Sequence, residues 1–437
     1  MRSVSLSISL HKLIFLSFVV LFRVLLDTSY SIVIVKDFAS EGFVLDVDPF
    51  NYMVSWLLYV ISLFMLSDRV KSVSQYFFVT AILCLIAPLT SLYGLDSTRP
   101  LFPVAASLGA LFISYFVSRQ NLLNFKGLPV VLGGRPLAVM VSLAFVVGLV
   151  VWFKISGAKS NLDFSEVYEY RELNAELTAQ GVLAYTNNWT FQVFSVYLIC
   201  FALYARRFFF VILLLGVQVY FFSVASHKSI LFLPLLVVSV WFYLRRSDSL
   251  VILPMACVGI MLLTMASYIF LDDLWLTSLL SRRVFYVPAD LCFVYFEYFS
   301  SHAHVYWSNS ILSSLQAYPY GRVAIPYVIG DYLGKPEMGA NNGFISSGFA
   351  HAGLFGVIFY AALVGLLLRL VNDLSSERMP VWVAIAISIV PLRSLLISSD
   401  LFTVMLTHGF AVAIVIMYLS RKKPSPTKVP CVKNLMS

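Results

Sequence analysis

The sequence predicts an all-α integral membrane protein, a polytopic bundle of about twelve transmembrane helices with one large outer loop. Of its 437 residues, 60% are hydrophobic and only 12% are charged, whereas about a quarter of the residues of a soluble domain are charged. Aromatic residues make up 16%, which suits lipid-facing helices and interfacial belts. A soluble fold of this composition would aggregate, so a lipid bilayer is the expected solvent.

Apolar segments long enough to cross a bilayer, which takes roughly twenty residues, recur along the whole chain. No small-residue cleavage site follows the first of them, so it is expected to be retained as a span. The segments lie near residues 12–35, 51–67, 76–95, 101–118, 136–153, 188–205, 207–224, 228–244, 249–271, 343–369, 379–397 and 400–419. Residues 1–419 are therefore expected to form a single membrane domain, and residues 420–437 a disordered cytoplasmic tail.

The distribution of basic residues predicts the orientation of this bundle in the membrane. The segments on one side contain eighteen of the thirty Lys and Arg residues, whereas the short loops on the other side contain four. The positive-inside rule then places both termini in the cytoplasm and two long loops, 154–187 and 272–342, on the outer side. The first of these carries acidic residues separated by apolar ones, a pattern of either a short interfacial amphipathic helix or a solvated lid.

Several classes of chemistry have no support in the sequence. The five cysteines are scattered without C-x-x-C spacing, so neither a disulfide nor a metal site is predicted. The P-loop, GxSxG, HExxH and EF-hand patterns are absent, and no cofactor is predicted. The net charge of +8 is largely explained by membrane orientation, so no nucleic-acid partner is expected.

The second outer loop is rich in tyrosine. Eight of the 24 tyrosines fall within it, and their flat apolar faces with a polar tip suit sugar rings as well as a membrane interface. They are Tyr286, Tyr295, Tyr298, Tyr306, Tyr318, Tyr320, Tyr327 and Tyr332, and Trp307 joins them.

Two adjacent arginines in this loop cannot be explained as cytoplasmic anchors. The guanidinium groups of Arg282 and Arg283 suit phosphate oxygens, although internal salt bridges are the equal alternative. Pro288 can begin a helix that places Asp290 and Glu297 on one face. Glu297, in an apolar aromatic stretch, is a candidate general base or the partner of an arginine.

Other ionisable or polar residues lie at the outer ends of spans. Lys228 occupies a very short turn, where it either contacts a lipid phosphate or simply reaches the interface. Asn341 and Asn342 precede a glycine-rich span and are expected to cap it with free N–H groups directed outward. His351, about two turns inside that span, is a second candidate base or a hydrogen-bonded core histidine.

Two further pairs of charged residues complete the candidates. Arg393 and Asp400 flank the turn between the last two spans and would join the same outer site if the helices converge. Arg23 and Asp27, four residues apart in the first span, are expected to neutralise each other as a structural pair.

Three stretches carry a resemblance to a known family. They are FSVASHKSILFLPLLVVSVWFYLRR at 222–246, RRVFYVPADLCFVYFEYFSSH at 282–302 and GANNGFISSGFAHAGLFGVIFY at 339–360. With the layout of the whole chain, they resemble the O-antigen or oligosaccharide repeat unit polymerases of the Wzy type in bacterial inner membranes.

The resemblance implies a GT-C-like membrane glycosyltransferase of lipopolysaccharide or related surface polysaccharide biosynthesis, acting on undecaprenyl-diphosphate-linked oligosaccharides at the periplasmic face. It implies that Arg282, Arg283 and Arg322 hold the diphosphate, with Lys228 beside them. Glu297 or His351 would deprotonate the acceptor hydroxyl. A chain-length regulator of the Wzz type is a possible partner under this resemblance. An O-antigen ligase and a polysaccharide flippase or transporter are the alternatives.

Overall fold

The protein folds into helices throughout. In this computed structural model, 74% of the residues are helical and the described residues contain no strand. The structure describes residues 9–121, 123–164, 166–178, 180–310, 313–376 and 379–422. Most of the predicted tail at 420–437 thus lies outside the described residues. The predicted all-α class is confirmed.

Each of the twelve predicted apolar segments coincides with helical structure to within a few residues. Seven helices in the described part of the chain are long and apolar enough to cross a membrane. They are Leu10–Asp37, Val73–Leu95, Leu101–Arg119, Gly134–Ile155, Phe208–Ala225, Ile252–Leu271 and Phe344–Ser375. Four apolar helices are shorter, namely Pro49–Met65, Lys228–Leu244, Val381–Ile397 and Phe410–Leu419. The chain is therefore a multi-pass helical protein, while twelve spans remain a prediction.

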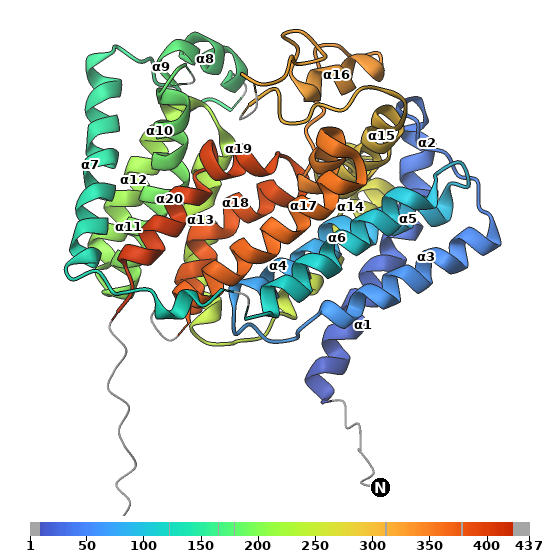
Figure 1. The fold of residues 1–437 in the computed structure, drawn as a ribbon, viewed down its shortest axis with the longest axis horizontal. Coiled ribbons are helices and arrows are strands. Elements are labelled where there is room, and N and C mark those ends of the chain that lie inside the picture. The colour runs from blue at the N-terminus through green and yellow to red at the C-terminus, as the bar shows by residue number, and fades with distance from the viewer. Residues whose placement is uncertain are drawn as a thin grey trace, which may run out of the picture. The chain divides into compact units, whose positions relative to one another are not determined.

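The chain divides into two compact units, which we describe separately. Unit 1 comprises Met1–Leu122, Tyr243–Arg369 and Ile389–Phe410, and unit 2 the remaining segments. The helices of unit 1 (Figure 1) are α1 (Leu10–Ser29), η1 (Tyr30–Ile34), α2 (Val35–Asp37), η2 (Ala39–Glu41), α3 (Pro49–Ser62), η3 (Leu63–Met65), α4 (Val73–Ala81), η4 (Ile82–Ile86), α5 (Ala87–Leu95), α6 (Leu101–Arg119), α14 (Ile252–Leu271), η7 (Thr277–Tyr286), α15 (Val287–Ser301), α16 (Ile325–Tyr332) and α19 (Leu401–Leu406).

Two long helices contribute to both units, α17 (Phe344–Ser375) and α18 (Val381–Ile397). The helices of unit 2 are η5 (Phe125–Gly127), α7 (Gly134–Ile155), α8 (Val167–Leu173), α9 (Ala175–Thr178), α10 (Leu183–Trp189), η6 (Thr190–Phe194), α11 (Ser195–Tyr204), α12 (Phe208–Ala225), α13 (Lys228–Leu244) and α20 (Phe410–Leu419).

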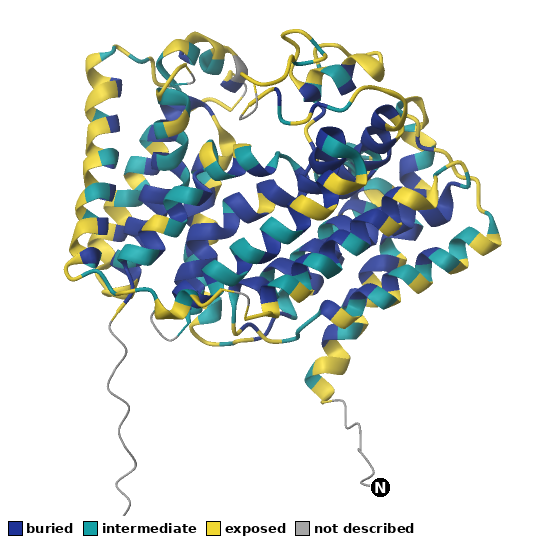
Figure 2. Cartoon of the chain, viewed as in Figure 1, coloured by how far each residue is buried: buried dark blue, intermediate teal, exposed yellow. Residues whose placement is uncertain are grey.

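The core of unit 1 forms around α5, every residue of which is buried. Helix α5 packs against α1, α3, α6 and α15, and α1 also packs against α14. Figure 2 shows the resulting burial, with exposed and buried residues interspersed along helices such as α3. Because lipid tails are apolar, exposed Leu and Phe side chains on these helices are the expected surface of a membrane protein.

The predicted pair in the first span is confirmed. Arg23 is fully buried and forms an ion pair with Asp27. The Arg23 guanidinium also donates hydrogen bonds to Ser55 at 3.2 Å and Thr90 at 3.3 Å. Ser91 donates to the Asp27 carboxylate at 2.5 Å. A charge buried in a bilayer is tolerated only when its polar atoms find such partners, so this network has a structural role.

Several spans contain π-helical turns, in which one extra residue is accommodated per turn. Among the described residues these are η1, η4, η6 and η7. The longest, η7, is ten residues long and leads directly into α15. It contains Arg282 and Arg283, so the directions of these side chains differ from those in an α-helix.

Helix α17 is broken near its start. Ala352 and Gly353 have non-helical dihedral angles, and Gly353 has a φ of +57°. The break leaves the carbonyl groups of Ala350 and His351 free to accept hydrogen bonds from the backbone N–H groups of Val305 and Tyr306, at 3.0 and 2.8 Å. The glycine-rich helix α17 thus consists of two helical pieces. The loop that follows α15 is hydrogen-bonded to α17 next to the break between them.

In unit 2, α11 packs against α7 and α12. The loop that precedes α10 forms two short helices, α8 and α9, as the interpretation of an amphipathic helix predicts. Asn174, between them, donates hydrogen bonds to the carbonyl groups of Lys159 at 2.8 Å and Val224 at 2.9 Å. This buried amide holds the loop against the end of α12.

Candidate functional site

A tyrosine-lined pocket lies between α15, α16 and the preceding loop of unit 1. Its volume is about 570 Å³, and we refer to it as the tyrosine pocket. Its lining residues are Tyr298, Tyr320, Val323, Tyr327, Val328, Asp331, Tyr332 and Pro336. Aromatic faces with a carboxylate among them suit a sugar ring. The aromatic rings pack on the C–H groups of the sugar, and the polar atoms form hydrogen bonds with its hydroxyl groups.

The rings of this pocket are held in place by their neighbours. Tyr298 stacks on His302 with ring centroids 3.9 Å apart and planes 4° apart. The Tyr320 hydroxyl donates to the Ala303 carbonyl at 2.6 Å, and the Tyr318 hydroxyl to the Val323 carbonyl at 2.7 Å. Burial raises the pKa of Tyr318 to about 12, so its hydroxyl remains a hydrogen-bond donor. The aromatic walls are therefore preorganised.

A second cavity, of about 680 Å³, lies on the other side of α15. We call it the acidic cavity, because four carboxylates and one guanidinium contribute to its lining. These are Glu41, Asp96, Asp290, Glu297 and Arg99, and its apolar wall includes Phe102, Phe293 and Phe296.

Arg99 is fixed within this cavity. It forms ion pairs with Asp96 at 2.9 Å and Asp290 at 2.6 Å, and its guanidinium lies 5.2 Å from the Phe293 ring. Burial raises the pKa of Asp290, although Arg99 partly offsets this effect. With two carboxylates already bound to it, Arg99 is a structural cation.

Glu297 lies where the two cavities meet. Its Oε1 accepts a hydrogen bond of 2.8 Å from the Tyr332 hydroxyl, and this bond raises the pKa of Tyr332. Glu297 is exposed and forms no ion pair among the described residues. The structure therefore does not support the alternative in which an arginine pairs with Glu297.

His351, the other predicted base, is 1% exposed and belongs to a buried network. Its Nε2 lies 3.1 Å from Asp400 Oδ2, and the Trp307 backbone N–H donates to its Nδ1 at 3.2 Å. Tyr360 donates to the same Asp400 oxygen at 2.8 Å, and the Trp307 ring stacks on His351 at 5.2 Å. Both ring nitrogens are engaged, which agrees with the interpretation of a hydrogen-bonded core histidine.

The two adjacent arginines have different environments. Arg282 forms an ion pair with Glu41, donates to Ser278 at 3.2 Å and lies 4.6 Å from the Phe38 ring. Arg283 is exposed and has no ion pair among the described residues. The internal salt bridge therefore applies to Arg282, and only Arg283 is left available to an anion.

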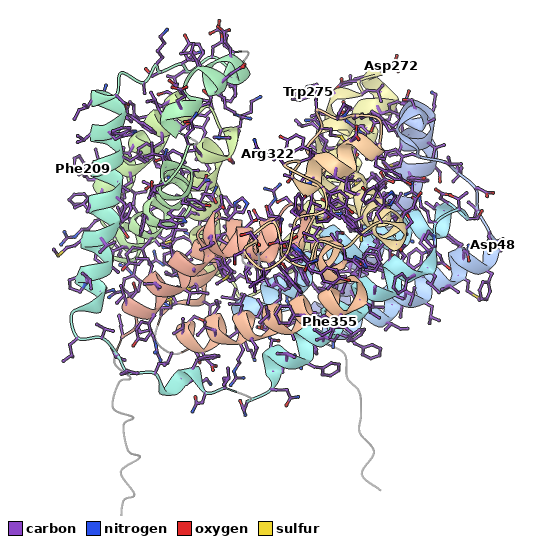
Figure 3. All side chains as sticks on the ribbon, turned by 45° about the horizontal axis from the view of Figure 1, so that its top comes forward. Asp48, Phe209, Asp272, Trp275, Arg322 and Phe355 are labelled. Atoms are coloured by element: carbon purple, nitrogen blue, oxygen red, sulfur yellow. The ribbon has the colours of Figure 1, made fainter. Side chains whose placement is uncertain are left out.

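Arg322 and Arg393 are both exposed, without an ion pair in the part of the chain that the structure describes. Arg322 is located in the loop between two segments of the tyrosine pocket wall, Tyr320 and Val323, and Figure 3 shows its position. Arg393 lies on α18. Of these two arginines, only Arg322 is adjacent in sequence to residues that line the tyrosine pocket.

The two asparagines were predicted to cap the glycine-rich span, and the structure shows that the Asn342 side chain bonds a backbone N–H just before α17. Asn342 is 4% exposed, and its Nδ2 donates to the Pro288 carbonyl at 3.1 Å, while its Oδ1 accepts from Gly343 N–H at 2.8 Å. Asn341 is exposed and donates to the Gly339 carbonyl at 3.2 Å. Asn342 thus joins α17 to the start of α15 instead of facing a ligand.

Lys228 belongs to unit 2, at the first position of α13. It is exposed, and its Nζ lies 5.8 Å from the Phe164 ring. The preceding residue, His227, has its pKa lowered to about 4 by partial desolvation and by the nearby Arg171 charge. Lys228 is accessible at this end of unit 2, as the sequence predicts for a residue in a short turn between spans.

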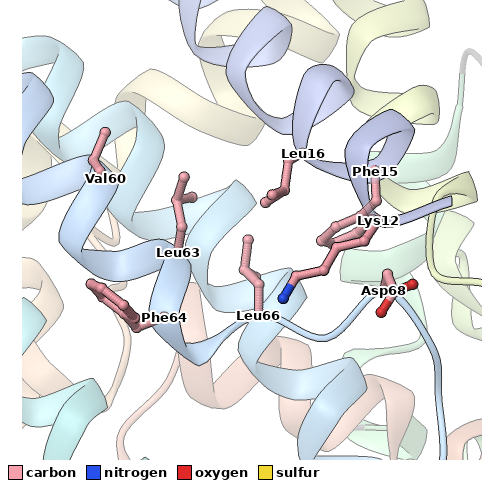
Figure 4. Close-up of a pocket in the computed structure, with 8 residues that line it drawn as sticks. All are labelled: Lys12, Phe15, Leu16, Val60, Leu63, Phe64, Leu66 and Asp68. Carbon is pink, nitrogen blue, oxygen red and sulfur yellow. The ribbon is translucent and has the colours of Figure 1, made fainter. Parts of the chain in front are cut away.

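A third pocket of unit 1 lies between α1 and α3, with a volume of about 310 Å³ (Figure 4). Apolar side chains such as Phe15, Leu63 and Phe64 line it, and Lys12 and Asp68 are its charged residues. No group of three His, Cys, Asp or Glu residues placed to hold a metal ion occurs in the described ranges. We assign no chemistry to this pocket.

Sequence reasoning did not find the partners that define these sites. The hydrogen bonds between Tyr332 and Glu297 and between His351 and Asp400 join residues 35 and 49 positions apart. A local pattern of apolar and polar residues cannot predict contacts between residues so far apart in the sequence. Comparisons with known proteins add nothing here, because no family model, no curated protein and no solved structure matches the chain.

Proposed function

We propose that this protein is a membrane glycosyltransferase that polymerises undecaprenyl-diphosphate-linked oligosaccharide repeat units into O-antigen or a related surface polysaccharide. In this proposal both termini are cytoplasmic and the tyrosine pocket opens at the periplasmic face of the bacterial inner membrane. The observation that carries it is the tyrosine pocket together with the exposed Arg322, which lies in the chain between the lining residues Tyr320 and Val323. Aromatic rings suit a sugar, and an unpaired guanidinium suits a diphosphate.

The reaction has the following steps. The acceptor hydroxyl of one repeat unit attacks the anomeric carbon of the first sugar of a second unit. The bond from this carbon to the diphosphate oxygen breaks, and undecaprenyl diphosphate leaves with the electron pair. Glu297 accepts the hydroxyl proton. Arg322 and Arg283 stabilise the charge on the leaving group, which is usually the largest contribution to such a reaction.

The lipid-diphosphate donor supplies the energy of this reaction. The bond to diphosphate is already activated, so the enzyme requires neither ATP nor a nucleotide-binding loop, and no such motif occurs in the sequence. A transporter would instead require ionisable groups along a path through the spans. In unit 1 the buried Arg23 and Asp27 are paired with each other and hydrogen-bonded to neighbouring side chains, which favours a structural role.

A deletion strain tests the proposal on a lipopolysaccharide gel. Loss of a polymerase leaves a single repeat unit on the lipid A core, whereas loss of either a ligase or a flippase leaves no repeat unit there. Complementation with Arg322→Ala should shorten or abolish the ladder, whereas Arg322→Lys should restore part of it. A deletion strain with an unchanged ladder would show that the proposal is wrong.

A further inference from the structure

The acidic cavity and the tyrosine pocket share a wall. Glu297 and Tyr298 are neighbours on α15, yet Glu297 lines the acidic cavity and Tyr298 the tyrosine pocket. The same division occurs at the end of α16, where Tyr332 lines the tyrosine pocket and Leu333 the acidic cavity. The hydrogen bond from Tyr332 to Glu297 therefore crosses the boundary between the two cavities.

The charge of the acidic cavity determines what it can bind. Its lining has four carboxylates against one guanidinium; Arg99 is paired with Asp96 and Asp290, and Glu41 with Arg282 from outside the lining, which leaves a net negative charge. A diphosphate would be repelled here, because like charges close together are unfavourable. Neutral hydroxyl groups donate well to carboxylates, and amino groups of sugars do so with charge assistance.

The apolar wall of this cavity is rigid and flat. Phe296 stacks on Phe349 with centroids 4.0 Å apart and planes 12° apart, and Phe102 packs edge-on against Phe296 at 5.6 Å. Phe102 remains substantially exposed, at 46%. An exposed aromatic ring next to carboxylates and the Ser300 hydroxyl provides the two kinds of contact that a sugar requires.

We propose that the acidic cavity binds the acceptor oligosaccharide, so that donor and acceptor sugars meet across Glu297. This inference rests on the proposed function and deepens it by assigning a separate site to each substrate. The donor sugar occupies the tyrosine pocket with its diphosphate toward Arg322. The terminal sugar of the acceptor occupies the acidic cavity and presents its hydroxyl to Glu297, which lies at the border and takes the proton.

Tyr332 positions this base. Its hydroxyl occupies Glu297 Oε1, which leaves the other carboxylate oxygen for the acceptor hydroxyl. In the reaction, the new bond forms between the acceptor oxygen and the anomeric carbon, and the bond to the diphosphate breaks. The proton of the acceptor hydroxyl passes to Glu297 and then to water, and the diphosphate leaves with the electron pair of the broken bond.

Two probes distinguish the sites experimentally. Undecaprenyl diphosphate without sugar reports on the donor site, and the free repeat-unit oligosaccharide, released from the strain's lipopolysaccharide, reports on the acceptor site. Binding of each is measured on the full chain in lipid nanodiscs. Ser300→Trp should fill the acidic cavity, since Ser300 lines it and, among the described residues, its hydroxyl donates to the Phe296 carbonyl alone. Ser301→Trp, at the next position and outside both linings, is the matched control.

We expect Ser300→Trp to weaken oligosaccharide binding at least tenfold and to leave undecaprenyl diphosphate binding within twofold of wild type. Ser301→Trp should leave both unchanged. Wild-type oligosaccharide binding in Ser300→Trp would overturn the acceptor site and leave the polymerase proposal standing. A wild-type protein that neither binds undecaprenyl diphosphate nor polymerises would instead refute the proposed function itself.

A second pair of variants tests the base without altering the cavity volume. Glu297→Gln should leave the binding of both probes within twofold and slow transfer at least a hundredfold, in the range observed for loss of a general base. Glu337→Gln, an exposed carboxylate in the same loop and in neither lining, should behave as wild type. Transfer by Glu297→Gln at the wild-type rate would refute the role of Glu297.

Discussion

The Nε2 atom of His351 lies 3.1 Å from Asp400 Oδ2, while Nδ1 of the same ring accepts the backbone N–H of Trp307. An N–H can bond only to a nitrogen with a free lone pair, so Nδ1 is unprotonated and Nε2–H donates to Asp400. With no free nitrogen, His351 is suited to position the broken helix α17 and the outer loop.

Substitution of His351 tests this role. His351→Leu should lower the stability by about 1–3 kcal/mol, because the Asp400 carboxylate and the Trp307 N–H each lose a partner. His351→Gln keeps a side-chain donor and should retain more stability and most of the polymerisation. Thermal unfolding in detergent and the lipopolysaccharide ladder measure the two effects. If both variants unfold like wild type but make no polymer, His351 has a chemical role.

The break in α17 brings two glycines into contact. A Cβ atom on Gly356 would lie 2.0 Å from the Gly348 carbonyl oxygen, which forces backbone movement. Gly356→Ala should therefore cost about 1–3 kcal/mol, measured as a lower thermal midpoint in detergent. Gly259→Ala on α14 is the control, since a Cβ there meets nothing within 4 Å. Equal midpoints for the two variants would contradict the close approach.

Substitutions of the two adjacent arginines should have different effects on stability and on binding. Arg282→Ala leaves the Glu41 carboxylate without its cation and should reduce the stability by about 1–2 kcal/mol. Arg283→Ala removes an exposed cation without a protein partner, so it should leave the unfolding midpoint unchanged and weaken undecaprenyl diphosphate binding. Binding and unfolding are measured on the same preparations. Loss of stability in Arg283→Ala would show that this side chain is also structural.

His227 predicts a pH dependence in unit 2. His227 is exposed by surface area, but partial desolvation by its neighbours and the Arg171 charge lower its pKa from 6.5 to about 4, so between these values the unfolded chain binds a proton that the folded chain does not. Stability should therefore fall as the pH decreases from about 6.5 toward 4. His227→Asn should reduce this slope, measured by thermal unfolding across the range. Identical slopes for wild type and variant would place the pH dependence elsewhere.

The helices could be predicted from the sequence because an apolar run in a membrane protein has few alternatives. Backbone groups in lipid must be paired within the segment, so each run becomes a helix. The break at Ala352 and Gly353 was not predictable, because apolar residues continue on both sides. Its carbonyl groups are satisfied by Val305 and Tyr306, and nothing in either stretch indicates that they meet.

The candidate site shows the same limit. Four of the eight candidate tyrosines in residues 272–342 line the tyrosine pocket, whereas Tyr286 and Tyr295 are buried in the core. The separation of Arg282 from Arg283 depends on Glu41, which lies 241 residues away. Charge pairing at such a distance is decided by the packing of whole helices, so sequence alone left both alternatives open.

The π-helical segment η7 makes the direction of Arg283 sensitive to insertions and deletions. One residue corresponds to about 100° of rotation around a helix axis, and η7 accommodates extra residues just before α15. A single deletion between Thr277 and Ser281 could be absorbed as an ordinary α-helical turn, with α15 and Glu297 kept in place. Such a change would redirect the arginines without replacing any side chain at the candidate site.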